Sequence, residues 1–192
     1  MRSTRERIVD AAAQVMRDQG LARATTKEIA RTAGCSEALL YKHFRAKEDL
    51  FLAVLQERVP GGLPRLLAGL ADEAGRDTVV GTLERVAHAA ITFYDESFPM
   101  AASIFSELRL LEGYRAAMRE RGAGPQTVNA GLAAYLRAEQ ALGRVRPEAD
   151  PEAVAALLLG ACLQHAFLRH FSDVEAPAEA AGRLARNLAA GL

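Results

Sequence analysis

Residues 25–44 read TTKEIARTAGCSEALLYKHF, and the architecture of the N-terminal part of the chain follows from them. Thr25 and Glu28 stand three residues apart, which is the spacing of a capping box, so a helix is expected to begin here. Gly34 ends that helix because glycine adopts the left-handed conformation at little cost. Ser36 is a good N-cap for a second short helix. Two short helices joined at a glycine have the layout of a helix-turn-helix.

The second helix is expected to have an inward and an outward face. Leu40 and Phe44 are four residues apart and face inward together. A helix this short has little stability alone and needs a scaffold. The preceding helix, Ser3 to Gln19, supplies one and completes a three-helix core. Its apolar stripe consists of Ile8, Ala12, Val15 and Met16.

These motifs resemble the DNA-binding segment of the tetracycline-repressor (TetR) family of bacterial regulators. That family has Thr-x-x-x-Ile-Ala, Ala-Gly-x-Ser, Leu-Tyr-x-x-Phe and Lys-Glu-x-Leu in this order, and the chain has all four. They are Thr25/Ile29-Ala30, Ala33-Gly34-Cys35-Ser36, Leu40-Tyr41-Lys42-His43-Phe44 and Lys47-Glu48-Asp49-Leu50. The resemblance implies an all-α fold of about nine helices. It places a three-helix helix-turn-helix DNA-binding domain at residues 1–46 and a helical ligand-binding and dimerisation bundle at residues 47–192.

Beyond residue 46 the pattern is helical throughout, and a few residues punctuate it. Ala46 is a poor N-cap for the helix that runs from 47 to about 59. Pro60-Gly61-Gly62 breaks this helix and is the candidate hinge. Pro99 is expected to start a further helix.

Composition and charge fit a globular chain with a polyanionic partner. The 192 residues are 50% hydrophobic, which is ample for a core, and the formal net charge is zero. Residues 1–50 carry ten Lys or Arg against seven Asp or Glu, and the rest carry fourteen against seventeen. A polyanion would select this asymmetry, although three charges also arise by chance. The three lysines of the chain are Lys27, Lys42 and Lys47.

The outward face of the second helix supplies candidate DNA contacts. Lys42 is placed to reach a phosphate or a guanine O6/N7, and Tyr41 and His43 to donate to phosphates. Residues at helix starts would grip phosphates, because the free amides there point outward. The alternative is an ordinary solvated face. The predicted DNA-binding set is Thr26, Lys27, Ser36, Glu37, Ala38, Leu39, Tyr41, Lys42, His43 and Lys47.

Three residues of this set are expected to influence which DNA sequence the protein binds. Ala38 or Leu39 is able to touch a thymine methyl group. Glu37 departs from the basic or small residue that is common in the family. It either reads a cytosine N4 donor or discourages wrong sequences.

Residues 153–163, AVAALLLGACL, form a helix that is apolar all the way round and must be covered on every side. One side can pack on the domain core and the other on a second subunit, and its small residues allow a close approach of backbones. We therefore predict a two-fold homodimer built from this helix and the C-terminal helix, and the family resemblance implies the same four-helix interface. The alternative is a central helix in a monomeric bundle. The expected interface residues are Ala153, Ala156, Leu157, Gly160, Ala161, Leu184 and Leu188.

Polar and aromatic residues within the apolar helices are candidates for contacts with a small hydrophobic ligand. Gln164 and His165 interrupt an apolar helix and need partners if they are buried. Arg109 is placed to fix an anionic group. The alternatives are plain core packing and, for His165, a satisfied interface histidine. The candidate set is Tyr94, Phe98, Phe105, Arg109, Tyr135, Gln164 and His165.

The sequence carries no Gly-rich phosphate loop, nucleophile elbow or metal-spaced His and Cys cluster. Cys35 and Cys162 lie far apart, which indicates neither a disulfide nor a metal site and fits a reducing cytoplasm. The longest uncharged stretch, residues 153–168, is too short and polar to span a bilayer. We therefore expect a cytoplasmic bacterial protein that is no enzyme, with no catalytic residue, cofactor, metal or membrane partner.

The sequence thus predicts a DNA-binding transcriptional regulator. The resemblance implies a homodimeric repressor that binds a palindromic operator in double-stranded DNA and is released by a small-molecule ligand acting through residues 47–59. The alternative is a DNA-binding dimer without such a ligand, either constitutive or controlled by a protein partner. A sizeable void among the central helices would favour ligand control, and a packed interior would oppose it.

Overall fold

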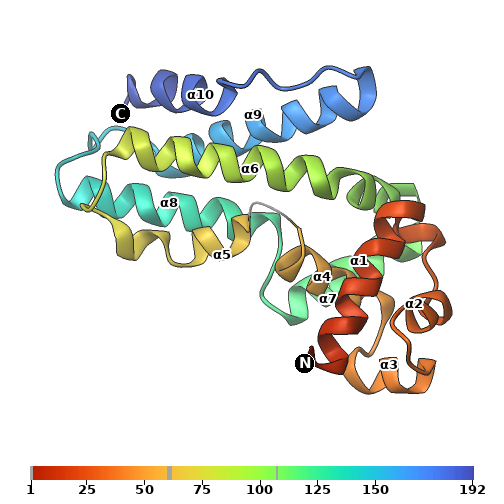
Figure 1. Cartoon of the computed structure of the whole chain (residues 1–192). Coiled ribbons are helices and arrows are strands. Elements are labelled where there is room, and N and C mark those ends of the chain that lie inside the picture. The colour runs from red at the N-terminus through yellow and green to blue at the C-terminus, as the bar shows by residue number, and fades with distance from the viewer. Residues whose placement is uncertain (1, 60–61, 107) are drawn as a thin grey trace. The chain divides into compact units, whose positions relative to one another are not determined.

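The computed structural model describes residues 2–59, 62–106 and 108–192. Over these ranges the chain forms ten α-helices, two short 3-10 helices and no strand (Figure 1). The all-α fold predicted from the sequence is confirmed. Contacts divide the chain into two compact units, which are residues 1–59 with 97–122 and residues 60–96 with 123–192. Pro60 and Gly61 of the expected hinge lie outside the described residues.

The first unit begins with the three-helix core. Ser3 and Glu6 form a capping box, in which the Glu6 amide donates to Ser3 Oγ at 3.2 Å and the Ser3 amide donates to the Glu6 carboxylate at 2.7 Å. The apolar stripe predicted for the first helix is buried. Gly20 has φ +76° and interrupts the helix just after Gln19. The helices are α1 (Thr4–Arg23), α2 (Thr26–Thr32) and α3 (Glu37–His43).

Two further helices lie wholly in the first unit, namely α4 (Lys47–Glu57) and α7 (Leu108–Glu120). Helix α4 packs on α1 and on α7. The rings of Phe51 and Tyr114 lie 5.5 Å apart, and Arg121 pairs with Asp49 at 2.7 Å. Ala46 makes no side-chain cap bond, as its small side chain predicts. The expected domain boundary at 46/47 therefore lies inside a compact unit, because α4 is held on both sides by other helices of that unit.

The second unit is a bundle in which α8 packs on α9, α5 packs on α8 and α10 packs on α9. Asp150 caps α9 by accepting hydrogen bonds from the amides of Glu152 and Ala153. Helix α6 begins in this unit, and its last residues, 97–102, belong to the first. The helices are α5 (Leu63–Ala68), α6 (Val79–Ala102), α8 (Pro125–Ala141), α9 (Pro151–Ser172) and α10 (Ala180–Ala189).

The prediction that Pro99 starts a new helix is wrong, because α6 continues through it to Ala102. A proline inside a helix has no amide hydrogen to donate to the carbonyl four residues earlier, which here is that of Asp95. His170 of α9 takes this place, since its Nε2 lies 3.0 Å from the Asp95 carbonyl oxygen. A side chain distant in sequence thus satisfies the group that proline leaves open.

A buried carboxylate in α8 was missed by sequence reasoning. Glu139 is fully buried because it lies four residues after the buried Tyr135, on the same helix face. It accepts a hydrogen bond from the Gly75 amide at 3.1 Å and pairs with Arg144 Nε at 3.2 Å. These partners indicate that Glu139 anchors the turn before α6. A charged residue on an apolar helix face was the available signal.

Candidate nucleic-acid interface

The turn between α2 and α3 has the geometry that its sequence predicts. Gly34 has φ +65°, in the left-handed region. The Gly34 amide donates to the Arg31 carbonyl at 3.1 Å and the Cys35 amide to the Ala30 carbonyl at 3.0 Å, which is the Schellman pattern of a helix end. Ser36 Oγ then accepts from the Leu39 amide at 3.2 Å and starts α3. Local chemistry therefore sets the angle at which α3 leaves the turn.

The start of α2 is only partly as expected. Thr25 Oγ1 accepts from the Glu28 amide at 3.2 Å, as in a capping box. The Glu28 carboxylate, however, accepts from the Gln19 side-chain amide at 2.9 Å and lies 3.7 Å from Arg31. Glu28 thus links α2 to the end of α1.

Helix α3 turns one face inward and one outward. Leu40 is fully buried, and Phe44 beyond the helix end is buried beneath the Arg5 guanidinium, which lies 5.4 Å from its ring centroid. Tyr41 is 49% exposed, and Lys42 and His43 beside it are also exposed. The outward side chains therefore form a hydrogen-bonding surface next to an apolar anchor. The other residues of the predicted set on this helix are Glu37 and Leu39, which are half-buried, and Ala38, which is exposed.

Thr26, Glu37 and Tyr41 form a hydrogen-bonded group that joins the start of α2 to α3. Thr26 Oγ1 donates to the Glu37 carboxylate at 2.5 Å. Its oxygen lies 3.3 Å from the Tyr41 hydroxyl, which is then the donor because the Thr26 proton is already committed. The carboxylate of Glu37 is therefore held in a fixed position on the outward face.

The side chain of Lys47, which was predicted to contact DNA, binds main-chain carbonyls of the protein. Its Nζ donates to the main-chain carbonyls of Leu21 at 2.7 Å, Ala22 at 3.3 Å and Ala24 at 3.0 Å. An ammonium group has three hydrogens, so all are used at the end of α1. The structure thus assigns Lys47 to the closure of this helix end, and we leave it out of the proposed phosphate contacts. Lys27 is exposed on α2 and stays in the predicted set.

The seven predicted ligand residues are divided between the two units. Phe98, Phe105 and Arg109 belong to the first unit and the other four to the second. Phe105 is 77% exposed, and Arg109 is exposed too. Both side chains are therefore largely open to solvent.

The four members in the second unit also differ among themselves. Tyr94 and Tyr135 pack in the bundle, and burial raises the pKa of each hydroxyl to about 12. Gln164 is exposed. His165 is half-buried and lines a cavity of about 260 Å³ together with Asp95 and Arg169. His165 is thus the member of the set that lies against a described cavity of this unit.

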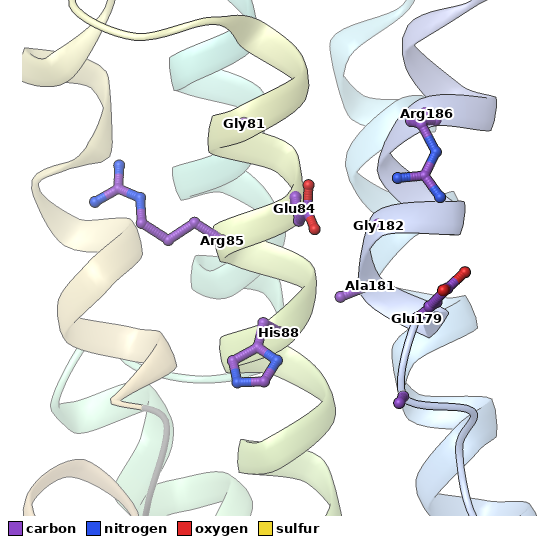
Figure 2. Close-up of a pocket in the computed structure, with 9 residues that line it drawn as sticks. Gly81, Glu84, Arg85, His88, Glu179, Ala181, Gly182 and Arg186 are labelled. Atoms are coloured by element: carbon purple, nitrogen blue, oxygen red, sulfur yellow. The ribbon is translucent and has the colours of Figure 1, made fainter.

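Two other cavities lie in the second unit. The larger, of about 610 Å³, lies between α6 and α10 and is lined mainly by small and charged residues (Figure 2). The other, of about 230 Å³, has an apolar lining from α5 and α8, with Leu67 and Val128 among its residues. Among the described residues, His, Cys, Asp and Glu side chains form no group of three or more that would hold a metal ion.

Helix α9 presents the expected interface stripe to solvent. Ala153, Ala156, Leu157 and Gly160 are exposed, and Leu157 reaches 62%. Ala161 is half-buried, as are Leu184 and Leu188 of α10. The stripe continues to Phe167 and Phe171, whose exposed rings stack with centroids 5.1 Å apart.

The opposite side of α9 is buried in the bundle. It includes Leu158, Leu159 and Cys162, and burial raises the pKa of the Cys162 thiol to about 12. By length and composition alone, α9 is long and apolar enough to cross a membrane, whereas its uncharged stretch was predicted from the sequence to be too short. Core helices meet the same criterion, so one such helix is weak evidence for a membrane span.

Helices α2 and α3 are joined by a turn at Gly34, and α3 presents polar side chains outward. This arrangement defines a protein of the helix-turn-helix class. Comparison with known proteins gives the family. The family model described as "Bacterial regulatory proteins, tetR family" matches residues 8–54. Residues 8–54 thus carry the DNA-binding domain of the TetR family.

One relative is the HTH-type transcriptional regulator BetI of Rhizobium meliloti, which is 34% identical over 111 residues that cover 58% of this chain and 55% of BetI. The chain spans about half the length of BetI and less of several other relatives.

Solved structures share the fold along nearly the whole chain. FadR from Bacillus subtilis, in complex with stearoyl-CoA, has a TM-score of 0.69 at 16% identity and covers 97% of this chain and 98% of its own. A Mesorhizobium loti protein assigned to the TetR family has a TM-score of 0.70 at 21% identity and covers 98% and 92%. At these identities the likeness concerns the fold alone.

Proposed function

We propose that the chain is a transcriptional regulator that binds double-stranded DNA through α3 and acts as a repressor in the bacterial cytoplasm. The observation that carries the proposal is the division of α3 into a buried Leu40 and an exposed face with Tyr41, Lys42 and His43. Lysine is able to pair with a phosphate or a guanine edge, and tyrosine and histidine donate to phosphates. The excess of positive charge in residues 1–50 supports the same partner.

We propose further that two copies form a two-fold dimer through α9 and α10. The support is the exposed stripe around Leu157 and Gly160, because a contiguous apolar face on a helix is unfavourable in water. A two-fold dimer would present two α3 helices to one face of the duplex. Their centres would then lie about 34 to 36 Å apart, or a small multiple of that, on a palindromic operator.

Small-molecule control is the third part of the proposal. A ligand bound in the second unit would favour a conformation with the wrong spacing of the α3 helices, and release would follow as a population shift. The FadR structure contains stearoyl-CoA, so a protein of the same fold is known to bind a small molecule. The competing candidate is a dimer without a small-molecule ligand, which the exposure of Phe105, Arg109 and Gln164 favours.

The test of DNA binding compares the wild type with Lys42→Ala across a salt series. We expect the variant to bind an operator duplex about tenfold more weakly, with a salt slope reduced by about one. Arg76→Ala is the matched control, because it removes an exposed positive charge from the second unit. Equal affinity and equal slope for Lys42→Ala and the wild type would show that α3 does not face the DNA.

A further inference from the structure

The groove between α6 and α10 has a floor of small residues and a wall of charged ones. The small residues are Gly81 on α6 and Ala178, Ala181 and Gly182 on or before α10. The groove measures about 610 Å³, which is within the usual range for small-molecule sites. In Figure 2 the stretch of α6 from Gly81 to His88 runs opposite the first turns of α10. The absence of a side chain at Gly182 keeps the space between Glu84 and Arg186 open.

A carboxylate and a guanidinium stand close together in this groove without pairing. If Gly182 carried a Cβ, that atom would lie 2.9 Å from Glu84 Oε1 and 3.0 Å from Arg186 Nη1. Within the described part of the chain, neither side chain has an ion-pair partner. The neighbouring Arg85, in contrast, is paired with Glu73. Two opposite charges thus flank a small gap at Gly182.

We propose that this groove binds a free α-amino acid with a polar side chain. The ammonium of such a ligand donates to Glu84, and its carboxylate accepts two parallel hydrogen bonds from Arg186, the geometry that a guanidinium fork favours. One zwitterionic head group satisfies both charges at once. His88 and Glu179 also line the groove, where they meet the ligand's side chain with hydrogen-bonding groups.

The site remains open in the proposed dimer. With 3.6 residues per turn, Gly182 and Arg186 lie on the opposite flank of α10 from Leu184 and Leu188, which are expected at the dimer interface. Only the effect of the ligand on DNA rests on the proposed function. Binding itself is measured on the free protein, so failure of one proposal is distinguishable from failure of the other.

The test is calorimetric titration of the full chain, without DNA, with L-glutamine, L-glutamate and L-lysine in turn. We expect saturable binding of at least one of them with a Kd of about 1 mM or tighter. N-acetylation of that amino acid removes the ammonium charge and should abolish the binding. If none of the three amino acids binds, the proposal is wrong.

Three variants locate the site. Glu84→Gln and Gly182→Ala should each weaken binding by about tenfold or more, the first by removing a charge and the second by filling the gap. The new methyl group meets only the ends of two flexible side chains, so Gly182→Ala is expected to fold. Arg183→Gln removes an exposed charge from α10 beside the groove and should bind as the wild type does. Wild-type affinity in both Glu84→Gln and Gly182→Ala would overturn the assignment.

Discussion

His170 Nε2 lies 3.0 Å from the main-chain carbonyl oxygen of Asp95, the carbonyl that Pro99 leaves without its helical donor. The Asp95 side chain faces the same helix, with Oδ1 at 3.3 Å from His170 and Oδ2 bonded to Arg169. One turn of α9 therefore completes the hydrogen bonding of α6 where the proline interrupts it.

This relationship predicts an energetic coupling between Pro99 and His170. His170→Ala should lower the free energy of unfolding by about 1 kcal/mol, because it leaves the Asp95 carbonyl without a donor. In a Pro99→Ala background the new amide reaches that carbonyl, so the same change should cost much less. Denaturant unfolding of the four proteins of the cycle measures the coupling. Arg169→Ala, which contacts the carboxylate instead, should show no such dependence on residue 99.

Lys47 is predicted to contribute to stability. Lys47→Met removes three donors from the carbonyls at the end of α1 and should cost about 2 kcal/mol in the free energy of unfolding. Lys27→Met, at an exposed position of α2, should stay within about 0.5 kcal/mol of the wild type. The structural role is contradicted if Lys47→Met unfolds like the wild type but loses DNA affinity.

Glu37 is predicted to govern discrimination between DNA sequences. The Thr26 hydroxyl donates to its carboxylate, and the Tyr41 hydroxyl donates to the Thr26 oxygen, so the carboxylate is held in place. Glu37→Ala should reduce the ratio of operator to scrambled-duplex affinity by about tenfold, mainly by strengthening the scrambled complex. Competition binding at one fixed salt concentration measures the ratio. Thr26→Val keeps the charge and should have a smaller effect; an unchanged ratio in Glu37→Ala would remove Glu37 from the interface.

Leu157 is predicted to hold the dimer together. Leu157→Asp places a charge in the centre of the exposed apolar stripe of α9 and should halve the mass measured by sedimentation. Ala130→Asp adds the same charge to the exposed face of α8 and should leave the mass unchanged. A monomeric wild type would contradict the dimer. A dimer that persists in Leu157→Asp would place the interface elsewhere.

Asp10 is predicted to contribute an acid-sensitive part of the stability. The hydrogen bond from Arg58, 2.6 Å long, lowers the pKa of Asp10 in the folded state. This contribution is present above the unfolded-state pKa of about 4 and is lost as the pH falls through the lowered native value. Asp10→Asn should therefore be less stable than the wild type at pH 7, with a smaller difference at pH 3. A difference of equal size at both values would rule out this linkage.

Local chemistry made the N-terminal helices predictable. Ser36 and Gly34 set the turn through bonds to residues within a few positions, and the spacing of Leu40 and Phe44 fixed the buried face. Residues 25–44 contain nearly all the information needed for this geometry. The path of α6 through Pro99 was not predictable, since its compensating donor, His170, is 75 positions from Asp95.

The candidate sites also combine features that the local sequence predicts with features that depend on long-range packing. Exposure of Tyr41 and Lys42 follows from the helical period, whereas the bonds of Lys47 to main-chain carbonyls depend on how α1 meets α4. The pair Glu84 and Arg186 comes together only when two helices far apart in the sequence pack in one bundle. Such long-range contacts have no signature in a single sequence.

The most direct test of the central claim is selection from a randomised duplex DNA library with the purified chain at a stated salt concentration. Salt control matters because phosphate contacts alone give strong, salt-dependent binding. A dimeric regulator that reads DNA through α3 should recover one palindrome, with half-site centres about 34 to 36 Å apart or a small multiple of that. Salt-sensitive binding without a shared sequence would contradict the account and make the helix-turn-helix a non-specific anchor.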